Sequence, residues 1–259
     1  MSGSRAILTF AGVLAALFGV YAWMSGRFGE DRTGVRGADE RELVTAGQQE
    51  REATMGLTAP RDVDGPPPAV EKGSTPLLGQ WDGRFNKHGW NHYGPGWFTL
   101  DHETGVLASH GGMGLLWYAA ETFGDFVLRL QFQTSLPESN SGVFLRVPEV
   151  PVSDDYIYHS FEVQIHGTAP DPIHRTGGVY DAVAPSRHLE RPPGEWNDME
   201  ISFIGDRIGV VLNGTQVVDW EAKPAGKVAD FASRGFIGLQ NHDWETSVWF
   251  RNIRVKKLD

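Results

Sequence analysis

Apolar and polar residues alternate one by one through most of residues 77–259, and this period of two is typical of β-strands with one buried face. The run VLRLQFQTS at 127–135 alternates in this way, and so do 142–146, 235–242 and 247–258. The stretch 199–220 indicates paired strands that turn at Gly205-Asp206 and at Asn213-Gly214, a dipeptide that favours two-residue hairpins. Since hardly any helical periodicity interrupts these runs, the sequence predicts an all-β sandwich or jelly roll of two antiparallel sheets.

The beginning of the chain follows a different pattern. After an n-region at 1–5, residues 6–24 carry no charge and would span about 28 Å as a helix, close to the thickness of a bilayer's hydrocarbon core. Tyr21 and Trp23 stand at its end, where amphipathic rings favour the membrane interface. We expect one N-terminal hydrophobic helix that precedes the sheet domain as a transmembrane helix or signal anchor. Cleavage at Val20-Tyr21-Ala22 is the alternative.

Residues 25–76 have no sustained apolar periodicity and end in a Pro-rich stretch, so they predict a flexible Gly- and Pro-containing linker. The domain at 77–259 is expected to be exported, periplasmic or extracellular, and anchored to the membrane by residues 6–24. Arg27, Arg32 and Arg36 follow the apolar segment and favour the opposite orientation, because positive charge prefers the cytoplasmic side.

Composition excludes several classes of protein. The 259 residues include no cysteine, which excludes disulfides, thiolate nucleophiles, thiolate metal sites and a lipid-modified cysteine anchor. Residues 1–76 hold 8 Lys and Arg against 10 Asp and Glu, so −8 of the formal charge of −10 belongs to 77–259. This acidic balance argues against nucleic acid as a partner. The absence of a GxSxG elbow, a P-loop and a dinucleotide fingerprint disfavours serine hydrolases, NTPases and Rossmann enzymes.

The string HSFEVQIHG at 159–167 is the most informative of the predicted strands. Its three apolar residues, at 161, 163 and 165, share one face, which would pack into the core of a sandwich. Ser160, Glu162, Gln164 and His166 must then share the opposite face, where they could bind a ligand.

Three further strand residues are candidates for chemistry. Arg146 in GVFLR could pair with Glu162 or hold substrate oxygens, and Gln240 and His242 share one face at the end of another strand. Glu162 and His242 are the best acid/base candidates, since His titrates near neutrality and Glu162 alternates into a polar row. The alternatives are a structural Glu162–Arg146 salt bridge and a loop-end hydrogen bond for His242. The other histidines lack metal-ligand spacing, so a dedicated zinc site is not supported, and His166 is a second-tier candidate.

Trp117, Trp196 and Trp244 lie next to polar, Gly-rich loops and could stack against the apolar faces of sugar rings. The alternative is that they fill the core, because a sandwich of this size needs large apolar residues.

Nine strings in one order resemble the 3-keto-disaccharide hydrolase family, also described as a 3-keto-glucoside lyase and 2-hydroxy-glucal hydratase domain. They are GDFVLRLQF (124–132), NSGVFLR (140–146), FEVQI (161–165), TGGVY (176–180), APS (184–186), PPGEWN (192–197), LNG (212–214), GFIGLQNH (235–242) and FRNIRVK (250–256). The resemblance covers essentially all of 77–259 and implies a concanavalin-like jelly roll.

The resemblance implies an enzyme that acts on glycosides oxidised at C3. The ketone acidifies the C2 proton, a base forms the enolate, the C1 oxygen leaves by β-elimination, and water then adds to the 2-hydroxy-glucal. On the matching motifs, Glu162 and His242 are the candidates for proton transfer and Arg146 for steadying the enolate oxygen. The expected substrate-binding residues are Asn140, Gln164, Trp117, Tyr180 and Gln240.

Two positions depart from the family pattern. Members often carry an acidic residue shortly after EVQI, where this chain has His166-Gly167, and a Gly after the His that matches His242, where it has Asp243-Trp244. A divalent metal ion could serve the elimination as a Lewis acid, but these departures leave its ligands unidentified.

Two other functions remain open at this point. A non-catalytic, lectin-like carbohydrate-binding module would need the same fold and the same polar groove. A conventional glycosidase would need a second carboxylate to partner Glu162, and the sequence does not identify one. The charge of 77–259 is compatible with a neutral sugar and fits an anionic one poorly.

Overall fold

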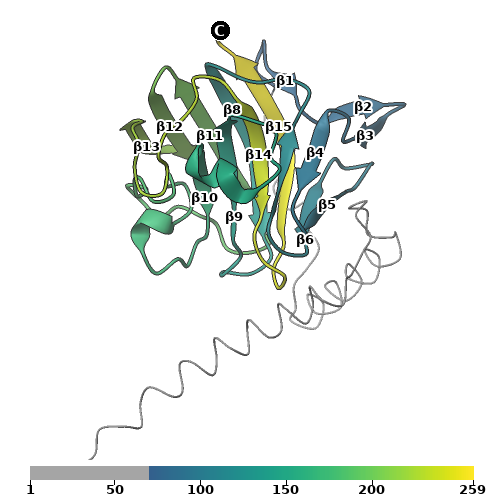
Figure 1. Ribbon diagram of the computed structural model, residues 1–259. Coiled ribbons are helices and arrows are strands. Elements are labelled where there is room, and N and C mark those ends of the chain that lie inside the picture. The colour runs from purple at the N-terminus through teal and green to yellow at the C-terminus, as the bar shows by residue number, and fades with distance from the viewer. Residues whose placement is uncertain (1–69) are drawn as a thin grey trace, which may run out of the picture. The chain divides into compact units, whose positions relative to one another are not determined.

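Two antiparallel β-sheets form the part of the chain that the computed structural model describes, residues 70–259 (Figure 1). The strands and the two 3₁₀ helices are β1 (Thr75–Pro76), β2 (Gly79–Trp81), β3 (Arg84–Asn86), β4 (Trp90–Tyr93), β5 (Trp97–Leu100), β6 (Leu107–His110), β7 (Gly114–Tyr118), β8 (Phe126–Thr134), β9 (Ser141–Val147), η1 (Asp154–Tyr158), β10 (Phe161–Ile165), η2 (Pro172–His174), β11 (Asn197–Ile204), β12 (Arg207–Leu212), β13 (Thr215–Glu221), β14 (Phe236–Asn241) and β15 (Val248–Lys257).

The larger sheet has eight strands in the order β13-β12-β11-β8-β15-β6-β5, with β1 paired to β15. The second sheet has five strands in the order β10-β9-β14-β7-β4, and β2 and β3 form a separate ribbon. The prediction of an all-β sandwich of two antiparallel sheets is therefore confirmed. The turn predicted at Asn213-Gly214 joins β12 to β13, and both residues have the positive φ, +50° and +79°, that such a tight turn requires.

The predicted n-region, the hydrophobic helix at 6–24 and most of the linker at 25–76 lie outside the described residues. Within 70–259 no helix is long and apolar enough to cross a bilayer. The last residues of the predicted linker are part of the sheet, since Thr75 and Pro76 pair with β15. Just before them, Glu71 forms ion pairs with Arg129 and Lys256.

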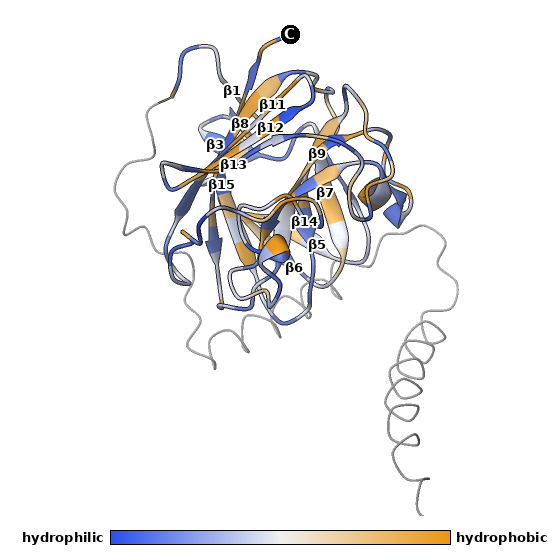
Figure 2. Cartoon of the chain, turned by 90° about the vertical axis from the view of Figure 1, so that its left-hand side faces the viewer, coloured by the Kyte–Doolittle hydropathy of each residue, from blue (hydrophilic) through white to orange (hydrophobic). Residues whose placement is uncertain are grey.

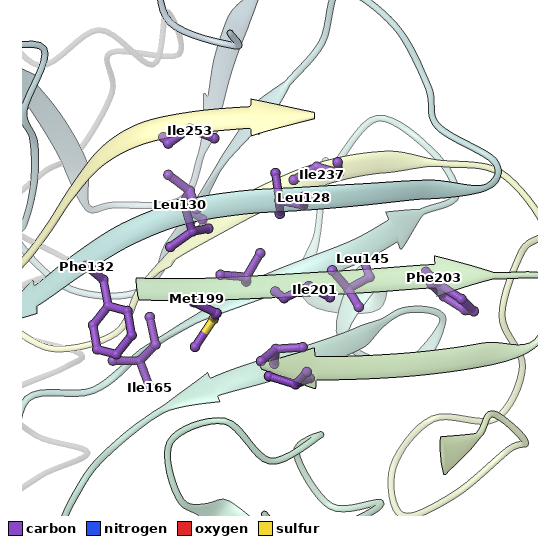
Figure 3. Packing of buried hydrophobic residues seen from close by; sticks show 14 of the residues in the cluster. Leu128, Leu130, Phe132, Leu145, Ile165, Met199, Ile201, Phe203, Ile237 and Ile253 are labelled. Atoms are coloured by element: carbon purple, nitrogen blue, oxygen red, sulfur yellow. The ribbon is translucent and has the colours of Figure 1, made fainter. Parts of the chain in front are cut away.

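The main hydrophobic core lies between the two sheets, because each sheet turns one apolar face toward the other. Figure 3 shows side chains from both sheets meeting there, among them Leu128, Met199 and Ile201 of the larger sheet and Leu145 and Ile237 of the smaller one. In Figure 2, hydrophobic stretches fall on strands such as β7 and β9. Alternation within the strands thus decides which residues are buried between the sheets.

A second, smaller apolar cluster covers part of the other face of the five-stranded sheet. It contains Leu115, Trp117, Phe144, Val147 and Tyr156. Leu115, Trp117 and Phe144 alternate with residues of the main core, so they point away from the larger sheet, and Tyr156 of η1 packs over this face. The rest of this outer face carries polar side chains.

A β-bulge interrupts the alternation at the end of β9. Phe236 pairs with Val147 and Gly238 with Phe144, so β9 advances three residues where β14 advances two. Arg146 lies in this bulge with a φ of +53°, an unusual value for a residue with a side chain. Val147 consequently returns to the face of Phe144, and Arg146 turns to the opposite face.

Candidate active site

A cavity of about 270 Å³ lies on the polar part of the outer face of the five-stranded sheet. Its floor comes from β10 and β14, which contribute Glu162, Gln164 and Gln240. Residues just outside the strands complete it, among them Asn140 before β9 and His242 after β14. Six of the eight predicted site residues line this one cavity: Asn140, Glu162, Gln164, Tyr180, Gln240 and His242.

Two larger hollows, of about 550 and 360 Å³, lie elsewhere on the described part of the chain. Their charged groups stand at the surface and pair with one another, as His159 does with Asp230 in the first and Arg129 with Glu200 in the second. The smaller cavity instead contains the buried carboxyl group of Glu162, and a buried titratable group favours a functional site.

Glu162 is the most deeply buried titratable group of the cavity, with 4 % of its surface exposed. Burial raises the pKa of its carboxyl group to about 7, against the lowering effect of the charges of Lys227 and His242. Its carboxylate lies over Gly142 of β9, the pairing partner of Gln164, and a Cβ at Gly142 would overlap Glu162 Oε1. A carboxylate with this pKa can accept and return a proton near neutral pH.

Three amides surround this carboxylate. The side chain of Gln164, turned so that its NH₂ group faces acceptors, donates to Glu162 Oε1 and to the main-chain oxygen of Ser141, both at 3.1 Å. Asn140 lies 3.1 Å from the Gln164 amide. Gln240 is 4 % exposed, and its Oε1 has no hydrogen-bond partner within residues 70–259. The cavity therefore offers neutral donors and acceptors suited to sugar hydroxyls.

Tyr180 forms a wall of the cavity together with the side chains of His174 and Lys227. The His174 ring stacks on it, with centroids 4.3 Å apart, and Lys227 Nζ lies 4.1 Å from its ring centroid. Asp181 holds both neighbours, since His174 Nε2 lies 3.1 Å from Asp181 Oδ1 and the main-chain N of Lys227 donates to Oδ2 at 3.1 Å. This arrangement places an ammonium group in the cavity that contains Glu162.

Two histidines stand near the carboxylate in different environments. Burial lowers the pKa of His166, the charge of His242 lowers it further, and Asp243 acts in the opposite direction. His242 lies beside Asp243, with Nδ1 3.8 Å from Oδ2. His166 is thus held neutral while His242 has an anionic neighbour.

The structure corrects the prediction for Arg146. Because of the bulge, its side chain lies on the face opposite to Glu162 and is 1 % exposed. Its guanidinium donates to the main-chain oxygens of Gly124 and Gly205, both at 2.9 Å, and pairs with Asp125 at 3.1 Å. The predicted Glu162–Arg146 pair is therefore absent, and Arg146 is not among the residues that line the cavity.

Trp117 is not brought to the cavity either. It is 2 % exposed and packs in the small cluster under η1, because it alternates with the core residues of β7. Trp196 is fully buried, and the guanidinium of Arg251 lies 4.0 Å from its ring centroid. Of the three tryptophans considered, Trp244 alone is partly exposed, at 38 %.

Sequence reasoning missed Lys227, His174 and the apolar lining residues Met113 and Ile157. Lys227 and Met113 lie in loops, Ile157 in η1 and His174 at the end of η2, and no period of two assigns a face in these segments. The TGGVY string pointed to the segment that contains Tyr180, but no comparable signal marked the loop with Lys227.

Within residues 70–259, no three His, Asp or Glu side chains come together in a way that could hold a metal ion. The polar cavity offers amides, one carboxylate and histidines that are separated from one another. The residues present therefore do not fit a divalent cation, and no step below depends on one.

Comparison with known proteins supports a carbohydrate-related family. Residues 75–256 match the sequence model of the 3-keto-alpha-glucoside-1,2-lyase-like domain. A protein from Bacteroides thetaiotaomicron named 3-keto-disaccharide hydrolase is 27 % identical over 230 residues, which cover 69 % of this chain and 77 % of that protein.

Two crystal structures of Parabacteroides distasonis proteins, each named as a candidate glycosyl hydrolase, are similar in fold. The first has a TM-score of 0.59 at 27 % identity and covers 71 % of this chain and 99 % of its own. The second has a TM-score of 0.61 at 18 % identity and covers 73 % and 95 %.

Proposed function

Because this chain belongs to the 3-keto-alpha-glucoside-1,2-lyase-like domain family, we propose that it cleaves the glycosidic bond of glycosides oxidised at C3. The observation that carries this proposal is the buried Glu162, with a pKa of about 7, in a cavity that is lined by amides and also contains the ammonium group of Lys227. Proton abstraction next to a ketone needs a base of this strength and a cation near the developing oxyanion.

The reaction proceeds in two stages. Glu162 takes the proton from C2, and the electron pair forms the enolate of the C3 ketone. The C1–O bond then breaks, C1 and C2 become joined by a double bond, and the ketone is restored as the leaving oxygen takes a proton from His242. Water adds to C1 of the resulting 2-hydroxy-glucal and a proton returns to C2, so the net outcome is hydrolysis.

Lys227 takes the role that the sequence suggested for Arg146. Its Nζ stands against the Tyr180 ring in the wall of the cavity, and its charge acts on Glu162. An ammonium group in that place stabilises the negative charge that moves from the base to the ketone oxygen. Gln164, Asn140 and Gln240 orient the sugar hydroxyls.

The conventional two-carboxylate glycosidase is disfavoured, because Glu162 is the sole carboxylate among the residues that line the cavity. The lectin-like module does not explain why a carboxyl group is buried at the floor of the cavity, where desolvation of its charged form costs free energy.

The test is to incubate the full chain with 3-keto-glucosides of both anomeric configurations and with the matching unoxidised glucosides. We expect cleavage of the keto forms alone, with deuterium incorporated at C2 when the reaction runs in D₂O. Binding without cleavage would favour the lectin-like module, and cleavage of the unoxidised sugar would favour a conventional glycosidase.

Export of the domain and its anchoring by residues 6–24 belong to the same proposal. Fractionation of cells that produce the full chain, followed by protease treatment of the intact membrane, tests them. We expect the domain in the membrane fraction and accessible from the outer side.

A further inference from the structure

A tight turn at 243–246 directly follows His242 and fixes one carboxylate beside it. Thr246 donates twice to Asp243 Oδ1, from its main-chain N and from its Oγ1, each at 2.8 Å. The main-chain oxygen of Asp243 accepts a hydrogen bond from Gly112 N at 3.0 Å, which ties the turn to the loop before β7. Two hydrogen bonds therefore hold the Asp243 carboxylate, and the third holds its main chain.

The other oxygen of this carboxylate faces the histidine. Asp243 Oδ2 lies 3.8 Å from His242 Nδ1, so a small rotation of the ring would close an ion pair. Because His242 lines the cavity while its Nδ1 is turned toward Asp243, the Nε2 edge is the one available to a ligand. A carboxylate that comes within hydrogen-bond distance of Nδ1 fixes both the ring orientation and the tautomer of a histidine.

Three titratable groups act on His242. Asp243 lies on its own turn, and Glu162 and His166 lie on and just after β10. Burial acts to raise the pKa of Asp243, but its contact with His242 and the hydrogen bonds from Thr246 outweigh this effect and lower it. Asp243 is therefore an anion at neutral pH, and its negative charge lies beside the ring of His242.

We propose that the turn formed by Asp243 and Thr246 is a positioning device that presents His242 as the acid for the leaving oxygen at C1. This inference rests on the proposed function and assigns one direction of proton transfer to each group. As the C1–O bond breaks, its electron pair goes to the leaving oxygen, which takes the proton from His242 Nε2. The C2 proton goes to Glu162, and the electron pair of the C2–H bond forms the C1–C2 double bond through the enolate.

The hydration stage restores the initial protonation states of His242 and Glu162. Neutral His242 accepts a proton from the water that attacks C1, and protonated Glu162 gives its proton to C2. No other reactant is needed. The histidine ends charged beside Asp243, and the carboxylate ends ionised beside Lys227.

The experiment compares leaving groups in the full chain. A 4-nitrophenolate leaving group needs no acid, whereas methoxide does, so we measure kcat/KM for 4-nitrophenyl and methyl 3-keto-glucosides. We expect Asp243→Asn to lower the value for the methyl substrate roughly 10²-fold and to leave the 4-nitrophenyl substrate within about 3-fold.

Two further variants separate positioning from a loss of structure. Thr246→Val removes one of the hydrogen bonds that fix Asp243 and should reproduce part of the effect, while Thr246→Ser keeps the hydroxyl and should retain activity. Asp230→Asn is the matched control, because Asp230 also pairs with a histidine, His159, but outside the cavity.

Equal loss on both substrates, or no loss on either, would overturn the proposal for Asp243. If the wild-type chain cleaves neither substrate, it is the proposed function that fails.

Discussion

The carboxylate of Glu162 occupies the space that a side chain on Gly142 would need. Gly142 of β9 pairs with Gln164 of β10, and the Glu162 side chain leans across to it from two residues away. A Cβ added to Gly142 would overlap Glu162 Oε1, with Glu162 Cγ and Cδ at 2.6 and 2.7 Å. The position of Glu162, the base of the proposed reaction, therefore depends on the absence of a side chain at Gly142 on the neighbouring strand.

We predict that Gly142→Ala lowers kcat about 10²-fold, because the methyl group pushes the carboxylate away from C2 by about an ångström. KM should change little, since the amides that hold the sugar remain. Steady-state kinetics with a 3-keto-glucoside measures both values. Gly79→Ala is the control, as a Cβ there meets nothing within 4 Å; an equal loss in both variants would contradict the prediction.

The pH dependence should report the carboxyl group of Glu162. Because burial raises its pKa to about 7, the base is protonated and inactive below that pH, so kcat/KM should rise about tenfold per pH unit up to neutrality and then level off. Glu162→Gln should abolish cleavage and the exchange of deuterium into C2 while leaving the thermal unfolding midpoint near that of the wild type. Residual exchange in this variant would assign the base to another residue.

Lys227 should stabilise the transition state through its charge. Lys227→Met is expected to reduce kcat/KM about 10²- to 10³-fold, the usual effect of removing one oxyanion partner. The same change should move the acid limb of the pH profile to higher pH, because the charge of Lys227 lowers the pKa of Glu162. Lys227→Arg keeps the charge and should recover the position of that limb; a limb that stays in place in Lys227→Met would argue against the assignment.

Arg146 should matter for stability and hardly at all for catalysis. Arg146→Met would leave the buried carbonyl group of Gly124 and the more exposed one of Gly205 without their donor, and it should lower the free energy of unfolding by about 2–4 kcal/mol. The kcat of the folded fraction should stay near the wild-type value. Denaturant titration and active-site kinetics check the two parts. Arg207→Met, which breaks an exposed pair with Asp219, should cost less than about 1 kcal/mol.

A second buried carboxyl group, outside the cavity, should make the fold sensitive to alkaline pH. Burial raises the pKa of Glu190 to about 7, although Thr176 and Thr134 donate to it. The folded state therefore binds its proton more tightly than the unfolded chain does. This stabilisation is complete below pH 4.5 and is lost as the pH rises through 7.

Glu190→Gln should remove that dependence. Relative to the wild type, the variant should have a similar free energy of unfolding at pH 4 and a higher one at pH 8, by up to about 3 kcal/mol. Urea titrations across this range measure the difference. A constant difference between the two proteins at all pH values would show that Glu190 titrates as in the unfolded chain.

The strands and the floor of the cavity could be predicted because both follow from alternation. Once Phe161 and Val163 are assigned to the core, Glu162 and Gln164 must point the other way, and the structure has them so. The same rule placed Gln240 on that face. Alternation along a strand is visible in the local sequence, so these side-chain directions could be predicted without knowing which distant residues pack against the strand.

The rest depended on contacts between distant parts of the chain. Arg146 changed faces because of a bulge whose register is set by β14, some ninety residues later in the sequence. Trp117 points to the side that alternation predicts, but η1 packs over that face of the sheet. Trp117 is therefore buried in the small apolar cluster and is not exposed to stack against a sugar. Lys227 reaches the cavity from a loop and His174 from η2, and in both segments the local sequence carries no information about direction.

The division of the cavity between strands and loops has a consequence for how such proteins diversify. Its floor belongs to β10 and β14, which also build the core, whereas Tyr180, Lys227 and His242 come from the connections between strands. Val179 and Val228 in these connections belong to the core, but the three residues on the cavity do not. Exchange of the cavity-facing residues alone would alter which aglycone or sugar is accepted and leave the core packing in place. Directed evolution toward new glycosides should therefore randomise the loops and leave the two strands alone.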